Sequence, residues 1–256
     1  MIEDITRTEV DRLIGNNWDF FHFPAVGRSG GQLALWRRDT TQFVVVSMMD
    51  QAIVGYLMLP NFQKWGIALV YASKSYHSHR LLWNTIGSSL DVDLPMIVRG
   101  DFNCCLDQSE KKGGRWYSYS VVAQEMAAFI VDNDLHDLGF IGPRFTWTNN
   151  KAKNSKIWVR LDRVLMNSEG LRLAPLATIK HLLRLSSDHC PMLLNLMFTS
   201  LRIGNRWYRF EDICHIQLLG NCWNRSKELG NLKNSLEARL EELQELETSN
   251  DGLNEA

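Results

Sequence analysis

The chain has 256 residues, 45% of them hydrophobic and 22% charged, with a formal net charge of −1. This is an ordinary globular composition, sufficient to bury the core of one large domain or of one domain with an appendage. No apolar run is long enough to span a bilayer, and the opening MIEDITRTEVDR lacks the apolar centre of a signal peptide, so we expect an intracellular protein without a membrane partner.

The distribution of charge indicates which partners the chain can bind, and the cysteine spacing indicates the state of its thiols. Residues 199–256 contain 7 basic and 10 acidic residues, which leaves 21 basic and 19 acidic residues in the preceding body. A net charge of +2 on that body is compatible with binding to a polyanion and favours such binding only weakly. The cysteines form no CxxC pair, which favours reduced thiols over a disulfide or zinc framework; they are Cys104, Cys105, Cys190, Cys214 and Cys222.

Residues 1–198 are expected to form one α/β domain of short strands and a few helices. Four apolar runs with polar or proline-containing breaks predict an antiparallel meander over 33–36, 43–49, 53–59 and 67–71. Helical spacing predicts helices over 79–90 and 120–131, with a short buried strand at 95–98 between them. Alternation predicts one strand over 158–165, and the apolar run 192–198 is typical of a strand covered on both faces.

The chain changes character after residue 198. Leucines at spacings of three and four, interleaved with Glu and Lys, predict an amphipathic helix within a linker and tail over 199–256; they are Leu229, Leu232, Leu236, Leu240 and Leu243. The stripe is too short to predict dimerisation, and we expect a monomer.

Three polar clusters lie at the ends of predicted strands: 100–103 (GDFN), 160–163 (RLDR) and 187–191 (SDHCP). Together they supply carboxylates, an amide and an imidazole, which is the set that phosphodiester hydrolysis requires. Carboxylate oxygens bind a hard divalent cation, a carboxylate can deprotonate water, and a histidine can donate to a phosphate oxygen. A carboxylate beside that histidine raises its pKa and keeps it a donor near neutral pH.

Each cluster also has a simpler interpretation. Asp101 could be a turn or cap residue, and Asp162 could pair with Arg160 or Arg163 on a solvated strand edge. The segment 188–191 could be an ordinary turn. The occurrence of all three clusters at strand ends favours a catalytic site over these alternatives.

The ordered motifs GDFN (100–103), FTW (145–147), RLDRVL (160–165) and SDHCP (187–191) resemble the endonuclease/exonuclease/phosphatase superfamily, which has the DNase I-like fold. The runs GRSGGQLALW (27–36) and VYAS (70–73) resemble the LINE-type retrotransposon branch found in plants, and RFE (209–211) resembles the segment that follows its nuclease. The resemblance covers about residues 1–215. It implies a four-layer α/β sandwich, here without its first strands and with a helical C-terminal tail.

The resemblance also implies catalytic roles. Asp101 matches the aspartate that activates the attacking water, and Asn103 matches its amide partner on the phosphate. Tyr71 matches the tyrosine that contacts the scissile phosphate. Asp162 matches the aspartate that orients the catalytic histidine, which is His189.

Further residues complete the implied site. Asp188 matches the aspartate near the metal, and Thr146 and Ser187 match polar residues that line the phosphate site. Trp147 is expected to pack rather than to catalyse. The implied cofactor is Mg²⁺, or alternatively Mn²⁺, with no small-molecule cofactor. The implied partner is DNA, and a functional enzyme would act in the nucleus.

Two features of the family pattern are missing from this sequence. A strand ending in Asn and a strand ending in a metal-binding Glu should both precede residue 1, whereas Glu3 and Glu9 lie at an expected helix start, where we expect them to be solvated. We therefore expect weak metal binding and impaired hydrolysis. An inert remnant of the same fold is the alternative. A phosphoinositide or sphingolipid phosphatase is disfavoured by GRSGG and VYAS, and by the lack of an amphipathic membrane surface.

Overall fold

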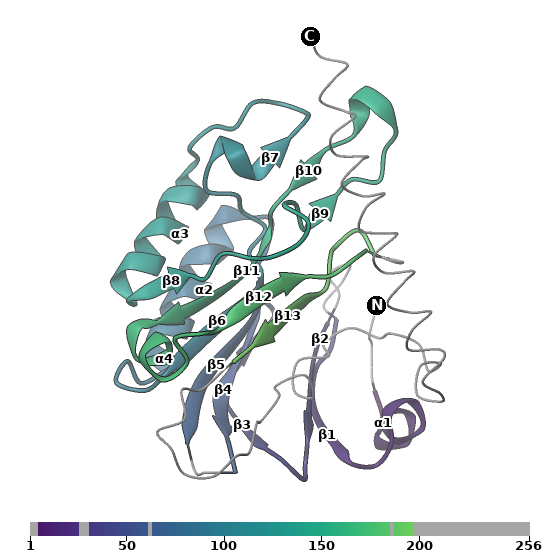
Figure 1. Ribbon diagram of the computed structural model, residues 1–256, viewed down its shortest axis with the longest axis vertical. Helices are drawn as coiled ribbons and strands as arrows, with labels where there is room; N and C mark the ends of the chain where they lie inside the picture. Colours follow the sequence, from purple (N-terminus) through teal and green to yellow (C-terminus); the bar gives the residue numbers. More distant parts are fainter. Residues whose placement is uncertain (1–4, 26–30, 61–62, 185–186, 197–256) are drawn as a thin grey trace.

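The computed structural model describes residues 5–25, 31–60, 63–184 and 187–196. These residues form an α/β sandwich in which a large mixed sheet carries helices on one face and smaller sheets on the other (Figure 1). The predicted tail helix, most of the GRSGG run and the RFE segment lie outside the described residues. Among the described residues, no helix is both long and apolar enough to cross a membrane.

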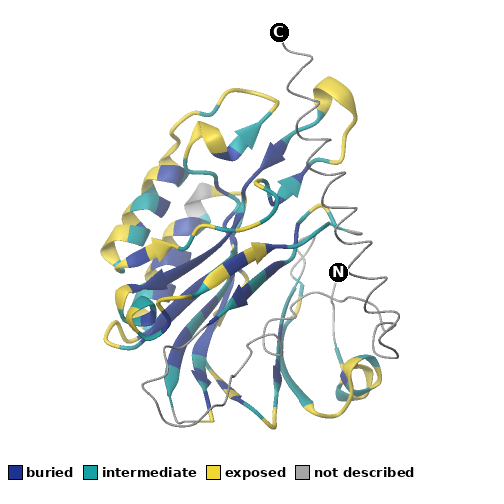
Figure 2. Cartoon of the chain, viewed as in Figure 1, coloured by how far each residue is buried: buried dark blue, intermediate teal, exposed yellow. Residues whose placement is uncertain are grey.

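Six strands form the large sheet: β3 (Gln42–Met49), β4 (Ala52–Met58), β5 (Lys64–Tyr71), β6 (Met96–Asp101), β8 (Leu135–Asp137) and β11 (Asp162–Asn167). They lie in the order β3-β4-β5-β6-β11-β8. Neighbouring strands are antiparallel except β5 and β6, which are parallel. Buried residues concentrate in the central strands of this sheet (Figure 2).

The predicted antiparallel meander is confirmed for β3, β4 and β5, but its first strand is placed wrongly. β2 (Gln32–Arg37) pairs with β1 (Trp18–Phe23) in a separate two-stranded sheet. The sequence of β1, WDFFHF, has large aromatic residues on both faces, and all six residues are half-buried. Because β1 lacks the alternating apolar and polar pattern of a strand with one buried face, hydrophobic periodicity did not predict it.

Two helices cover one face of the large sheet, α2 (Tyr76–Ser89) and α3 (Val121–Asp132), close to the predicted ranges. Ser120 begins α3, because its side chain accepts a hydrogen bond from the Ala123 backbone N–H. Trp83 stacks on Phe129 with ring centroids 4.6 Å apart, which joins the two helices. The large apolar area of this pair stabilises the helical layer.

The opposite face is covered by two small sheets. One is β1-β2, beside helix α1 (Arg7–Ile14), and the other is β12 (Thr178–His181) with β13 (Met192–Asn195). Helix α4 (Ser168–Leu173) contacts β6 and β11 of the large sheet. Trp65 and Ile97 of the large sheet form part of the core beneath them. The expectation that the last strand is covered on both faces is wrong, since Met192 and Leu194 are buried while the residues between and after them are half-buried.

A third small sheet, β7-β10-β9, lies at one end of the sandwich: β7 (Lys111–Lys112), β10 (Trp158–Val159) and β9 (Trp147–Thr148). Short 3₁₀ turns, η1 (Gln108–Glu110) and η2 (Lys153–Ser155), precede β7 and β10. The single strand predicted over 158–165 is therefore wrong. The chain leaves β10 for a different sheet at Arg160 and Leu161, and β11 begins at Asp162.

The cysteines that the structure describes are free thiols. Cys104 and Cys190 are buried, and Cys105 is half-buried. None of these three forms a disulfide with another described cysteine, and the expectation of reduced thiols stays a prediction for the chain. Cys214 and Cys222 lie outside the described residues.

Candidate active site

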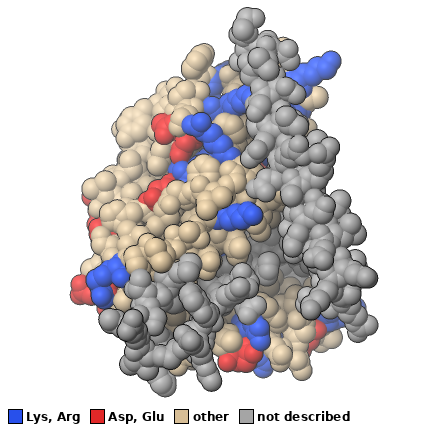
Figure 3. All heavy atoms as spheres, in the orientation of Figure 1, with Lys and Arg blue, Asp and Glu red and all other residues tan. Residues whose placement is uncertain are grey.

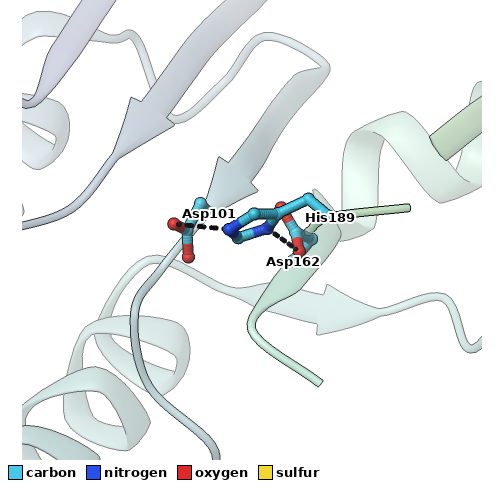
Figure 4. Close-up of side chains that lie close together, drawn as sticks. All are labelled: Asp101, Asp162 and His189. Atoms are coloured by element: carbon cyan, nitrogen blue, oxygen red, sulfur yellow. Dashed lines mark hydrogen bonds and ion pairs between the residues drawn. The ribbon is translucent and has the colours of Figure 1, made fainter. Parts of the chain in front are cut away.

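Three neighbouring strands of the large sheet end at the site and position its acids. Asp101 ends β6, and its cross-strand partners are Tyr71 at the end of β5 and Asp162 at the start of β11. His189 approaches from the segment before β13 (Figure 4). The structure therefore brings together the acids and the histidine that the motifs singled out, although they are far apart in the sequence.

Asp162 and His189 form a direct pair. The Asp162 Oδ2 atom lies 2.8 Å from His189 Nδ1, and His189 Nε2 lies 3.8 Å from Asp101 Oδ2. The backbone of His189 is held by its N–H, which donates to Ser187 Oγ, and by a bridge to Trp147 on β9. Because Nδ1 faces the carboxylate, Nε2 is the ring nitrogen directed toward Asp101.

The turn after β6 fixes the Asp101 carboxylate. The Asn103 backbone N–H donates to Asp101 Oδ1 at 2.8 Å, and Asn103 Nδ2 donates to the Ala72 carbonyl at 2.7 Å. Asn103 adopts a φ of +46°, a conformation that Asn tolerates better than most residues. At Gly100, with a φ of +138°, an added Cβ would lie 1.9 Å from the Val70 carbonyl oxygen, so only glycine fits there.

The electrostatics of the cluster favour both a bound proton and a bound cation. Burial and the nearby charge of Asp162 raise the pKa of Asp101 to about 7. Burial lowers the pKa of His189, but the hydrogen bond and charge of Asp162 outweigh this and raise it. One ligand atom from each of the three side chains lies within 4.8 Å of the others, so Asp101, Asp162 and His189 fit a divalent cation.

Tyr71 lies at the rim of the site. It is partly exposed, and burial together with the charges of Asp101 and Asp188 raises the pKa of its hydroxyl. The phenol therefore stays protonated and can donate a hydrogen bond near neutral pH.

The remaining predicted site residues occupy different positions. Asp188 is exposed, its Oδ2 accepts a 2.9 Å hydrogen bond from Trp147 Nε1, and it is not part of the three-residue cluster. Ser187 holds the backbone of His189, as described above. Thr146 is fully buried, and its Oγ1 accepts hydrogen bonds from the Leu161 and Asp162 backbone N–H groups. A buried hydroxyl does not line a phosphate site, so we replace that expectation for Thr146 with a role in positioning Asp162.

Two buried side chains that no sequence motif indicated hold the loop after β5. The buried Gln51 side chain accepts a hydrogen bond from the Ser73 N–H and donates to the Ser78 carbonyl. His79, also buried, contacts the Ser73 carbonyl through Nε2. This loop carries Lys74, whose charge acts on Asp101. Neither Gln51 nor His79 belongs to a motif, so no local signal could have identified them.

A buried ion-pair network supports the other side of the site. Arg160 and Arg163 both pair with Glu110 and with Asp137. Glu110 also accepts a 2.7 Å hydrogen bond from the Leu106 N–H, which anchors the loop after Asn103. The alternative that Asp162 pairs with Arg160 or Arg163 is wrong, because both arginines use other acids and Asp162 contacts His189.

The architecture is that of the DNase I-like fold. The structure is similar to the endonuclease domain of TRAS1, a telomere-specific non-LTR retrotransposon, at 15% identity with a TM-score of 0.56, over 72% of this chain and 82% of that one. It is also similar to an AP endonuclease from Archaeoglobus fulgidus, at 12% identity with a TM-score of 0.51, over 75% of this chain and 83% of that one. No protein-family model and no curated protein matches the chain.

Proposed function

We propose that the chain carries the site of a metal-dependent endonuclease that hydrolyses phosphodiester bonds in DNA, derived from a plant LINE-type retroelement. The observation that carries the proposal is the pairing of Asp162 with His189 beside the buried Asp101. The two nucleases of the same fold support the choice of reaction. The sequence motifs support the retroelement origin.

The side chains divide the reaction between them. Asp101, with a pKa of about 7, is partly ionised near neutral pH and accepts a proton from the attacking water. His189, with a raised pKa, donates from Nε2 to a phosphate oxygen as charge builds there, while Asp162 holds the ring. Tyr71 donates to the phosphate from the rim. When bound, Mg²⁺ or Mn²⁺ would be held by carboxylate oxygens of Asp101 and Asp162, with Asp188 as a proposed further ligand, and would supply charge stabilisation at the phosphate.

We further propose that residues 1–256 by themselves are impaired. Among the described residues, β1 and β2 pair only with each other, and so do β12 and β13, so both small sheets have outer edges without a partner strand. Ile67 and Leu69, in the middle of a central strand, are only half-buried on the face below these sheets. The buried Nη1 of Arg99 on β6 has no hydrogen-bond partner. These features support the idea that added strands bearing an acid would complete the second sheet.

Glu9 is a poor substitute for a metal-binding glutamate. Its carboxylate accepts hydrogen bonds from the Thr6 N–H and hydroxyl in a capping box that begins α1. The expectation of an acid at a helix start is confirmed for Glu9, whereas Glu3 lies outside the described residues. An inert remnant of the same fold is the second candidate function, and the unpartnered strand edges favour it.

The test is nicking of supercoiled plasmid at increasing Mg²⁺. It compares this chain with the chain extended upstream by the encoded in-frame sequence, and each with its His189→Ala variant. Metal stabilisation of a phosphoryl centre is worth several kcal/mol, so we expect the extended chain to be faster by about a hundredfold or more. Equal rates that both require His189 would refute impairment. Rates that ignore His189→Ala in both chains would refute the nuclease site.

The same proposal includes a monomer acting on nuclear DNA. Light scattering at micromolar concentration would test the first point. The location of a tagged full-length chain in cells would test the second. A stable dimer, or exclusion from the nucleus, would contradict the corresponding part.

A further inference from the structure

Basic residues are segregated in two segments that meet at the small sheet β7-β10-β9. Residues 111–124 contain three basic and no acidic residues, and residues 138–161 contain five basic and no acidic residues. The pairing of β7 with β10 brings these segments together. In the orientation of Figure 3, Lys and Arg gather toward this end of the molecule. We define the basic surface by Lys111, Lys112, Arg115, Lys151, Lys153 and Lys156.

Among the described residues, the acids directly before this surface in the sequence are Asp107 and Glu110. Glu110 is buried and pairs with Arg160 and Arg163. Asp107 accepts a hydrogen bond from the Ser109 N–H at the start of η1. The two segments contain basic and no acidic residues, so the surface has an excess of positive charge that attracts a polyanion.

A loop held at both ends carries an exposed tryptophan at the edge of the basic surface. Gly113 has a φ of +77°, and a Cβ there would lie 2.3 Å from the Lys156 carbonyl oxygen, so the loop packs closely on the β9–β10 connection. Tyr117 anchors the other end, because its hydroxyl donates to the Leu106 carbonyl at 2.6 Å. Between these anchors Trp116 is 84% exposed and Arg115 is exposed beside it, and Tyr119 just beyond is 56% exposed.

The basic surface is continuous with the candidate active site. His189 bridges to Trp147, Trp147 pairs with Val159, and Val159 pairs with Lys111, so these residues form one cross-strand row. The row from His189 to Lys111 crosses three strand-to-strand spacings, which amount to about 15 Å. A nucleic-acid strand cut at His189 would reach the basic surface within a few nucleotides.

We propose that the basic surface and Trp116 bind an unpaired nucleic-acid strand adjoining the bond to be cleaved. This inference rests on the proposed function and narrows its substrate to DNA with a single-stranded segment beside the cut. A duplex keeps its bases stacked inside and offers only phosphates to lysine and arginine. An unpaired strand offers phosphates to the basic residues and base faces to an exposed aromatic ring, which together match this surface.

The experiment measures binding of a fluorescein-labelled thymidine oligonucleotide, and of a duplex of the same length, by anisotropy in EDTA at several salt concentrations. Trp116→Leu removes the stacking ring, and Trp116→Phe keeps an aromatic face. Lys151→Gln with Lys153→Gln removes two exposed charges. Arg12→Gln, on α1, is the matched charge control because Arg12 is exposed and lies outside both segments.

We expect Trp116→Leu to weaken single-strand binding about tenfold and to leave duplex binding nearly unchanged, with most affinity retained by Trp116→Phe. The double lysine variant should lower the slope of log affinity against log salt by about 1.4 for the single strand. Loss of affinity for the duplex as large as for the single strand, or no loss from Trp116→Leu, would overturn the proposal. Because binding is read without metal, a chain that binds in this way but never nicks would refute only the nuclease function.

Discussion

Thr146→Val should destabilise the protein strongly, although valine and threonine have nearly the same shape. Valine matches threonine in shape but cannot accept the hydrogen bonds that Thr146 Oγ1 receives from the Leu161 N–H at 2.9 Å and the Asp162 N–H at 3.0 Å. Leaving a buried donor unsatisfied costs about 1–3 kcal/mol, so the buried Asp162 N–H and the part-buried Leu161 N–H together cost about 2–4 kcal/mol. Most domains have a total stability of only about 5–15 kcal/mol.

Urea unfolding followed by tryptophan fluorescence measures this cost, with Thr146→Ser as the matched control. Serine keeps the acceptor and loses one methyl group, which costs about 1 kcal/mol. Valine should therefore lower the free energy of unfolding by at least about 1 kcal/mol more than serine. Equal losses from the two variants would show that Thr146 acts through packing alone, and that the break between β10 and β11 does not depend on its hydroxyl.

Three further outcomes follow from the charged groups. Asp162→Asn should lower the pKa of His189 in an NMR titration, because the Asp162 hydrogen bond and charge raise it; an unchanged pKa would contradict the pairing. Glu110→Gln should destabilise the fold by about 3–5 kcal/mol in urea, since it leaves buried Arg160 without a full partner; a loss below about 1 kcal/mol would contradict this. Burial raises the pKa of Asp137, but Arg160 outweighs it and lowers the pKa below 3.8. Its stabilisation is therefore present above that pH and lost as pH falls through the folded pKa, and acid unfolding of Asp137→Asn should lack this component.

The fold was predictable where one periodic pattern dominated. β3, β4, β5, α2 and α3 each have a clear period and a clear break at their ends, and the structure confirms them. β1 was missed because aromatic residues occupy both of its faces. The break at Arg160 was missed because its cause lies in Thr146 and Glu110, which are distant in sequence from the strand.

The candidate site, like the fold, could be predicted from the sequence only in part. Asp101, Asp162 and His189 each end or follow a strand, so their convergence could be anticipated once a sandwich was assumed. Thr146 shared the motif signal of the other residues, but its burial depends on how β9 packs against β10. No sequence pattern distinguishes a hydroxyl that faces substrate from one that faces two backbone donors.

Support for the candidate site comes from residues that the chemistry does not use. The Asp101 carboxylate depends on Asn103, whose amide is tied to Ala72. Ala72 precedes the loop segment that Gln51 and His79 hold. A misplacement of about 1 Å in such a site can cost about a hundredfold in rate. Loss of the Gln51 hydrogen bonds should therefore lower the nicking rate as much as a substitution at the rim residue Tyr71. Gln51→Met tests this, because it removes those hydrogen bonds without changing a residue that takes part in the chemistry.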